Sequence, residues 1–202
     1  MSAGDDIVAV TRRLTPESAL EAYGRGVFPM AAPRLRIVTW HQPEPRAIIP
    51  LERFHISRSL KRTLRKGALE ASYDRAFAEV MRGCAEGRPV WISAEFHRVY
   101  SELHRRGRAH SVEVWHQGRL VGGTYGVQLG GAFCAESKFH RLRDASKVAL
   151  CRLVERLRER GFVLLDVQYL TPHLAQFGTI EIPHREYLRR LRAAMELERC
   201  FG

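Results

Sequence analysis

Two glycine-containing turns in the middle of the chain, at 117–118 and 129–131, restrict its fold most strongly. They separate three stretches rich in β-prone residues, at 110–115, 120–128 and 132–136. Short turns of this kind join antiparallel neighbours, so the region predicts a meander of three strands. A helix with one apolar side follows at 145–160, and the apolar run at 162–167 predicts a buried strand. The order of elements predicts an α+β fold, in which helices flank a mostly antiparallel sheet.

Capping residues mark further helices along the chain. Thr15, Ser57 and Ser93 each precede a helical pattern. The expected helices cover residues 16–24, 58–66, 74–85, 93–106 and 183–198, with a short strand at 69–73. The stretch 27–50 is rich in proline and aromatic residues, and it predicts irregular structure with one short strand at 36–39. We therefore expect a small N-terminal part, residues 1–50, and a main catalytic domain, residues 51–202.

The charge of the chain points to a polyanionic partner. Thirty-three Lys and Arg residues against 22 Asp and Glu give a net charge of +11. Such an excess favours nucleic acid first and an anionic membrane second, the alternative being a solvated basic surface. One helix concentrates this charge, because Arg58, Lys61, Arg62 and Arg65 recur at helical spacing and Lys66 adds to them. A polyanion would offset their mutual repulsion, although an ordinary solvated helix is the competing interpretation.

No segment predicts a membrane anchor or a metal site. The first 14 residues have no continuous apolar stretch, and no window approaches the roughly 18 apolar residues that a membrane span requires. The four cysteines lie far apart, without the close Cys and His spacing of a zinc site. Scattered thiols suit a reducing compartment, so we expect a cytoplasmic protein without a metal.

Three polar residues stand at the ends of predicted strands. Asp166 and Gln168 are two residues apart on the strand at 162–167, and ideal alternation would place them on one face. Glu136 ends the third strand of the meander, where a carboxylate suits a cationic group or an amine. The alternatives are a hydrogen-bonded aspartate at a strand end and, for Glu136, a salt bridge with Lys147 or Arg143.

An ordered set of short segments resembles the leucyl/phenylalanyl-tRNA–protein transferase family. They are AY (22–23), GVFP (26–29), PEPRA (43–47), FHISRSLKR (54–62), WI (91–92), AHSVEVW (109–115), LVGG (120–123), YGV (125–127), ES (136–137), ASK (145–147), LD (165–166), Gln168, His173, EIP (181–183) and Arg185. Each is weak alone, but together they cover most of residues 14–191 in the family's order.

The resemblance implies an enzyme that takes Leu or Phe from aminoacyl-tRNA and adds it to proteins with N-terminal Arg or Lys. That addition marks them for degradation by the N-end rule. The family's main domain looks like the GCN5-related acetyltransferase fold, used with tRNA in place of coenzyme A. No metal or organic cofactor is implied, because the ester is already activated.

By resemblance, Asp166, Gln168 and Glu136 are catalytic. The Gln168 amide oxygen would orient the attacking amine, and Asp166 would supply negative charge for the developing ammonium. The basic helix would hold the tRNA acceptor stem through its phosphates. An apolar pocket for the donated amino acid would be lined by Met30, Trp91, Tyr100, Thr124 and Phe133.

Four positions depart from the family's usual residues. Met30 stands in place of Trp, Thr124 in place of Met, His41 in place of an aromatic residue and Lys138 in place of Met. The reaction type survives these changes, but the preference among Leu, Phe and Met stays open, because pocket shape discriminates weakly between apolar groups. Lys138 adds a cation that could alter the preference for the acceptor.

Three other classes of protein compete with this interpretation. A coenzyme A-dependent N-acetyltransferase shares the expected fold, but it needs a glycine-rich loop before the long helix, and residues 141–147 contain no glycine. A non-catalytic RNA-binding module explains the charge but not the three polar residues. A transferase that recognises acidic N-termini belongs to a family whose motifs are absent.

Overall fold

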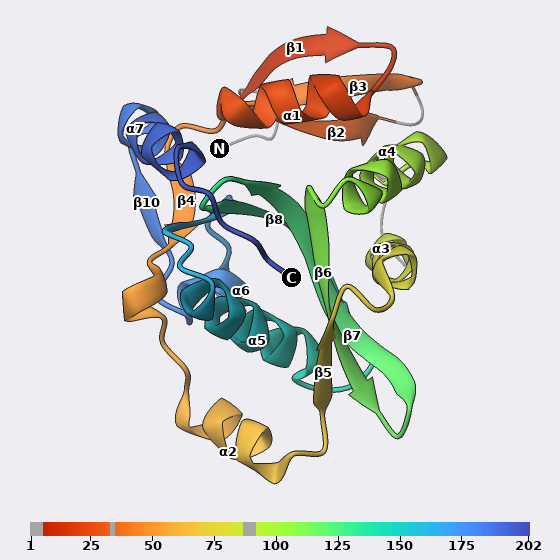
Figure 1. Cartoon of the computed structure of the whole chain (residues 1–202), viewed down its shortest axis with the longest axis vertical. Helices are drawn as coiled ribbons and strands as arrows, with labels where there is room; N and C mark the ends of the chain where they lie inside the picture. The colour runs from red at the N-terminus through yellow and green to blue at the C-terminus, as the bar shows by residue number, and fades with distance from the viewer. Residues whose placement is uncertain (1–5, 33–34, 87–91) are drawn as a thin grey trace.

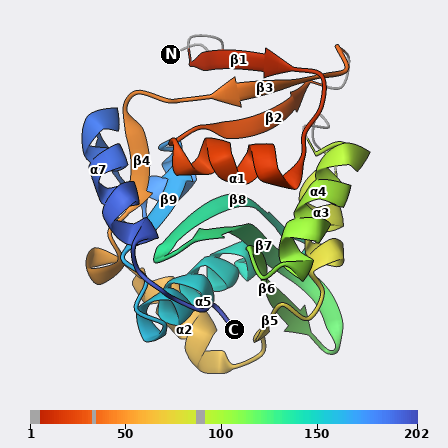
Figure 2. The ribbon, with the colours of Figure 1, turned by 45° about the horizontal axis from the view of Figure 1, so that its top comes forward.

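The computed structural model describes residues 6–32, 35–86 and 92–202, which form two β-sheets with helices around them (Figure 1). The smaller sheet has the strand order β1-β3-β2 and is antiparallel. Its strands are β1 (Ile7–Thr11), β2 (Phe28–Ala32) and β3 (Ile37–His41), and helix α1 (Pro16–Gly24) packs beside them. Figure 2 shows this small sheet and α1 lying over β8 of the larger sheet.

The larger sheet has the order β10-β4-β9-β8-β7-β6-β5. Its strands are β4 (Arg46–Ile49), β5 (Glu70–Tyr73), β6 (Ala109–His116), β7 (Arg119–Leu129), β8 (Ala132–His140), β9 (Leu164–Gln168) and β10 (Ile180–Ile182). All neighbouring pairs are antiparallel except β8 and β9, which are parallel. The structure therefore confirms the predicted α+β fold with a mostly antiparallel sheet, and it confirms the meander, now seen as β6, β7 and β8.

Helices cover the two faces of this sheet. The helices are α2 (Arg58–Lys66), α3 (Phe77–Ala85), α4 (Ala94–Arg105), α5 (Ala145–Glu159), α6 (Pro172–Ala175) and α7 (His184–Met195), with a 3-10 turn at Leu51–Arg53. Apolar residues of α3 and α4 share one core with α1 and β2, whereas those of α5 form a second core with Phe133, Leu165 and Val167. The site described below lies between these layers.

Capping residues and glycines in the sequence predicted most helix ends correctly. The side chain of Thr15 accepts a hydrogen bond from the backbone of Ser18, and Ser57 and Ser93 cap α2 and α4 in the same way. Helix α2 ends at Gly67, which adopts a left-handed φ of 67° that glycine tolerates without strain.

The stretch 27–50 differs from the sequence-based prediction. We expected irregular structure with one strand, but the chain forms β2, β3 and β4 there. The strands are short, and β3 also pairs with β1 and β4 with β9, which lie farther away in sequence, so tertiary pairing as well as local propensity decides them. The chain passes from the smaller sheet to the larger one between His41 and Arg46. His41 pairs with β1 of the smaller sheet, whereas Arg46 pairs with β10 of the larger one.

Candidate active site

Asp166 lies on β9, an interior strand of the larger sheet, and is completely buried. Arg46 of β4 binds it with two parallel hydrogen bonds, Nε to Oδ1 at 2.9 Å and Nη2 to Oδ2 at 2.7 Å. The Tyr187 hydroxyl of α7 donates to Oδ2 at 3.0 Å, and the backbone N–H of Gln168 donates to Oδ1 at 3.0 Å. Each carboxylate oxygen therefore accepts two hydrogen bonds.

Arg46 is as deeply buried as its partner. Its guanidinium lies 4.5 Å from the ring centre of Tyr187 and 5.0 Å from that of Phe28, and its Nη1 donates to the carbonyl of Gly26 at 2.9 Å. Burial lowers the pKa of Arg46, but Asp166, Tyr187 and Cys134 together raise it by more, so the net pKa is raised. The pair thus joins the small N-terminal sheet, β4, β9 and α7 at one ionic centre.

The Arg46 contact changes the role that Asp166 can play. A carboxylate neutralised by a bidentate arginine has little negative charge left for a developing ammonium. Its geometry instead fixes the end of β9, which carries Gln168. Sequence reasoning quoted Arg46 only within a matching motif. Arg46 begins a strand whose other residues, Ala47, Ile48 and Ile49, are apolar. A buried arginine at such a position requires a buried acid, and this pattern could have predicted its pairing with Asp166.

Gln168 ends β9 in a left-handed conformation, with a φ of 60°. A non-glycine residue with this φ leaves the extended chain, so ideal strand alternation no longer fixes the direction of its side chain. The residue is 7% exposed, and its Nε2 is buried without a hydrogen-bond partner. The unpartnered group is an N–H donor, so it has capacity left for an acceptor atom of a substrate.

Glu136 is the extra residue of an irregularity in β8. Ser137 pairs with Tyr125 and Ala135 with Gly126, so Glu136 has no counterpart on β7. Its Oε2 accepts from the Tyr100 hydroxyl at 3.3 Å, which lies 2.5 Å from the Tyr23 hydroxyl, and its Oε1 is buried without a partner. Such bulges commonly redirect a side chain next to an active site.

The surroundings of Glu136 favour its neutral form. Burial raises the pKa of Glu136 to about 8, and the charge of Asp166 adds to the increase, while hydrogen bonds from Tyr23 and Tyr100 and the charge of Arg46 oppose it. The expected alternative, a salt bridge with Lys147 or Arg143, is not seen, because both lie beside Asp144, at 3.1 and 3.9 Å.

The predicted pocket residues lie on two different faces of the larger sheet. Tyr100 and Met30 belong to the core of α3 and α4, on the side of Glu136. Phe133 packs in the core of α5, and Thr124 lies opposite Val112 of that same core. The structure therefore does not bring these four side chains together. Trp91 lies outside the described residues.

The predicted tRNA-binding residues gather on α2. Arg58, Lys61, Arg62, Arg65 and Lys66 are exposed, and none forms an ion pair with a residue in the described part of the chain. The first four, which we call the basic stripe, line a groove of about 510 Å³. Figure 1 shows α2 at the end of the molecule away from the small N-terminal sheet.

The fold and the site define a two-sheet α+β protein in which a buried ionic centre joins the sheets beside an amide and a carboxyl group. Comparison with known proteins then identifies the family. Residues 48–192 match the family described as leucyl/phenylalanyl-tRNA protein transferase, and residues 12–44 match the N-terminal domain of that family. The chain belongs to the leucyl/phenylalanyl-tRNA protein transferase family.

Curated relatives agree with this assignment. The leucyl/phenylalanyl-tRNA–protein transferase of Rubrobacter xylanophilus is 55% identical over 191 residues, which is 94% of this chain and 100% of the relative. The protein of the same name from Herpetosiphon aurantiacus is 51% identical over 193 residues, 95% of this chain and 100% of the relative. A solved ribosomal-protein-alanine N-acetyltransferase from Brucella melitensis is 14% identical over 54% of this chain and 85% of that one, with a TM-score of 0.40. A similarity this low supports no statement about function.

Helices suited to crossing a membrane are absent from the described ranges, where none is both long and apolar enough.

Proposed function

We propose that this protein transfers Leu or Phe, with Met as a further candidate donor, from aminoacyl-tRNA to the N-terminal Arg or Lys of target proteins in the cytoplasm. This transfer would mark the targets for degradation by the N-end rule. The observation that carries the proposal is the membership of the chain in its family, with relatives about half identical over their full lengths. Membership favours aminoacyl transfer over coenzyme A-dependent acetylation.

The reaction forms a C–N bond at the ester carbonyl and breaks the ester bond to the ribose oxygen, which leaves with a proton. Catalysis requires that the amine and the ester be aligned and that one proton be removed from the amine. Gln168 would accept a hydrogen bond from the amine through its side-chain oxygen. The Arg46–Asp166 pair supports this role, because it holds the backbone of Gln168 at 3.0 Å from Asp166.

Glu136 would accept the proton. Its pKa of about 8 lies near that of an N-terminal amine, and matched values favour proton transfer in both directions. The Tyr100 hydroxyl holds one oxygen, and the other has no partner and can face the substrate. The same carboxyl could also contact the cationic side chain of the acceptor.

A transfer assay tests the proposal. The protein is incubated with tRNA charged with Leu, Phe or Met and with peptides that begin with Arg, Lys, Asp or Ala. We expect transfer of Leu and Phe to the Arg and Lys peptides. Absence of transfer to every peptide would rule out the enzyme, and transfer to the Asp peptide alone would rule out the acceptor class.

Replacing Glu136 by Gln should lower kcat about a hundredfold or more at pH 8, because the proton acceptor is lost. The advantage of the native protein should shrink about tenfold for each pH unit below 8, since Glu136 becomes neutral as the pH falls below its pKa. The ratio of the two kcat values is the quantity to measure, because titration of the peptide amine is common to both proteins. Glu196→Gln, at an exposed position, is the control. A ratio that does not vary with pH would contradict the role.

Reversing the charge of Lys61, Arg62 and Arg65 to Glu should weaken binding of aminoacyl-tRNA. The slope of log K against log salt should fall by about two to three units, close to 0.9 for each lost phosphate contact. Binding is measured over a series of salt concentrations, with Arg119→Glu, an exposed change on β7, as the control. Equal slopes for the native and reversed proteins would show that the basic stripe does not bind tRNA.

A further inference from the structure

Four basic side chains gather near the start of α5, and the proposed reaction uses none of them. Lys138 and His140 lie on β8, Lys147 lies in the first turn of α5, and His173 lies in α6. We call these four residues the basic cluster.

Strand pairing places the cluster on the α5 side of the larger sheet. In the described structure, β8 pairs with β9 from Ala132 to Cys134 and continues to His140 without it. His140 lies opposite Gly122, and a Cβ added to Gly122 would meet that of Ala145 at 2.6 Å, so this face belongs to α5. The imidazole of His140 is also 3.5 Å from the Ser146 hydroxyl. Lys138, two residues before His140, shares that face.

The four groups interact electrostatically. Burial lowers the pKa of His173, and the nearby Lys138, Lys147 and His140 lower it further. The Nε2 of His173 is buried without a hydrogen-bond partner. Asp144 lies beside Lys147, and their contact at 3.1 Å offsets the charge of that lysine. Basic groups brought together in this way repel one another, and an anion with several acceptor oxygens would relieve the repulsion.

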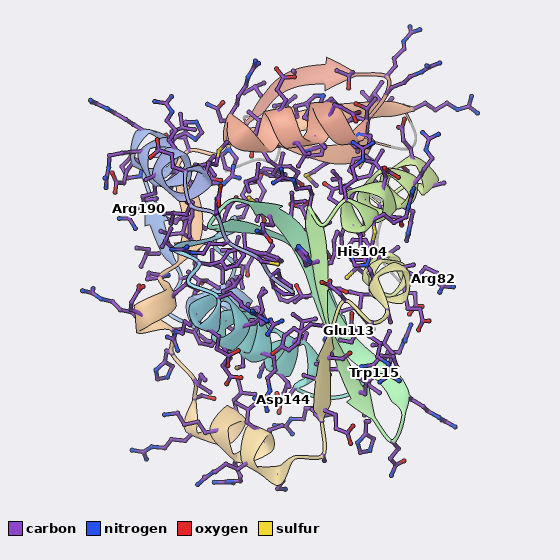
Figure 3. The ribbon with its side chains drawn as sticks, viewed as in Figure 1. Arg82, His104, Glu113, Trp115, Asp144 and Arg190 are labelled. Carbon is purple, nitrogen blue, oxygen red and sulfur yellow. The ribbon has the colours of Figure 1, made fainter. Side chains whose placement is uncertain are left out.

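The cluster connects two parts of the proposed tRNA site. On one side, the Thr63 hydroxyl of α2 is 3.5 Å from the Asp144 carboxylate, and Figure 3 shows Asp144 between α5 and α2. On the other side, α6 begins at Pro172, four residues after Gln168. A nucleic-acid strand that runs from the basic stripe to Gln168 would therefore pass the cluster.

We propose that the basic cluster binds an internucleotide phosphate in the unpaired 3′ end of the donor tRNA. Lys138 and Lys147 supply point charges, and the exposed imidazole of His140 and the half-buried imidazole of His173 supply N–H donors. The inference rests on the proposed function and adds a contact that places the ester, whereas the basic stripe binds phosphates farther from it.

Two small donors test the contact separately from the rest of the tRNA. Leucyl-adenosine has no phosphate, and a leucylated CCA trinucleotide has two internucleotide phosphates. For each, kcat/KM is measured with an Arg peptide. In the native protein, the CCA donor should have the higher value. In Lys138→Gln and in His173→Gln, that advantage should fall about tenfold, the size expected for one charge-assisted hydrogen bond. Arg119→Gln, on the exposed end of β7, should leave the advantage intact.

The outcomes separate the inference from the proposed function. If kcat/KM fell equally for both donors in the two variants, the phosphate contact would be overturned, because the residues would then act on the reacting centre or on folding. The contact would also be overturned if the two variants lost binding of inorganic phosphate but kept the native kcat/KM for both donors. The ligand of the cluster would then be a free anion. Absence of transfer from either donor, with the native protein, would instead overturn the proposed function itself.

Discussion

Replacing Arg46 by Met is expected to lower the free energy of unfolding by about 3–5 kcal/mol, the usual cost of removing one partner from a buried ion pair. Asp166 has no exposed surface and would lose both hydrogen bonds from the guanidinium, while those from the Tyr187 hydroxyl and the Gln168 N–H would remain. The contact of Arg46 with the carbonyl of Gly26 would be lost in the same step. Denaturant unfolding at neutral pH measures the change.

The double variant Arg46→Met/Asp166→Leu tests whether the ion pair mainly stabilises the fold or mainly positions Gln168. Replacing both charges with apolar groups of similar volume is often neutral or favourable, so most of the stability should return. Transfer should stay low in the double variant, because the carboxylate that holds the Gln168 N–H is absent. A double variant as unstable as Arg46→Met, or one with full activity, would contradict this account.

The parts of the fold that local chemistry decides were predictable from the sequence. Helices α1, α2 and α4 begin at a capping Thr or Ser, and α2 ends at a glycine that tolerates the left-handed conformation. Strands β1, β2 and β4 carry no comparable signal. All five residues of β1 are exposed, β2 contains Pro29, and β4 is held by β9, whose residues lie about 120 positions later.

The site could be predicted in part, for the same reason. The polar residues at the ends of β8 and β9 stand out in the sequence, but the partners that determine their chemistry do not. Asp166 is neutralised by Arg46, and Glu136 is held by Tyr100 and Tyr23, each from a distant element. The irregularity at Glu136 also changes the alternation of β8, so the side of the sheet on which each β8 side chain lies cannot be read by counting.

Replacing Gln168 by Ala is expected to lower kcat about a hundredfold, with a small effect on the KM of the peptide. Its role is to align an amine that binds through other groups, and loss of alignment affects the transition state more than the ground state. The amide is a very weak base, so a large loss would arise from orientation and not from proton removal. Single-turnover transfer from leucyl-tRNA to an Arg peptide measures it, with Gln176→Ala, an exposed change after α6, as the control.

Gln168→Glu separates orientation from proton transfer. A carboxylate here would lie in a buried setting, and burial raises the pKa of the new acid. At neutral pH it would be largely protonated and would still present a carbonyl oxygen to the amine, so activity should lie between that of the native protein and that of Gln168→Ala. Activity above the native level, rising with pH, would mean that the position accepts the proton, and the base would then be residue 168 and not Glu136. Full activity of Gln168→Ala would remove the residue from the mechanism altogether and leave Glu136, with its unpartnered oxygen, as the group that both aligns and deprotonates the amine.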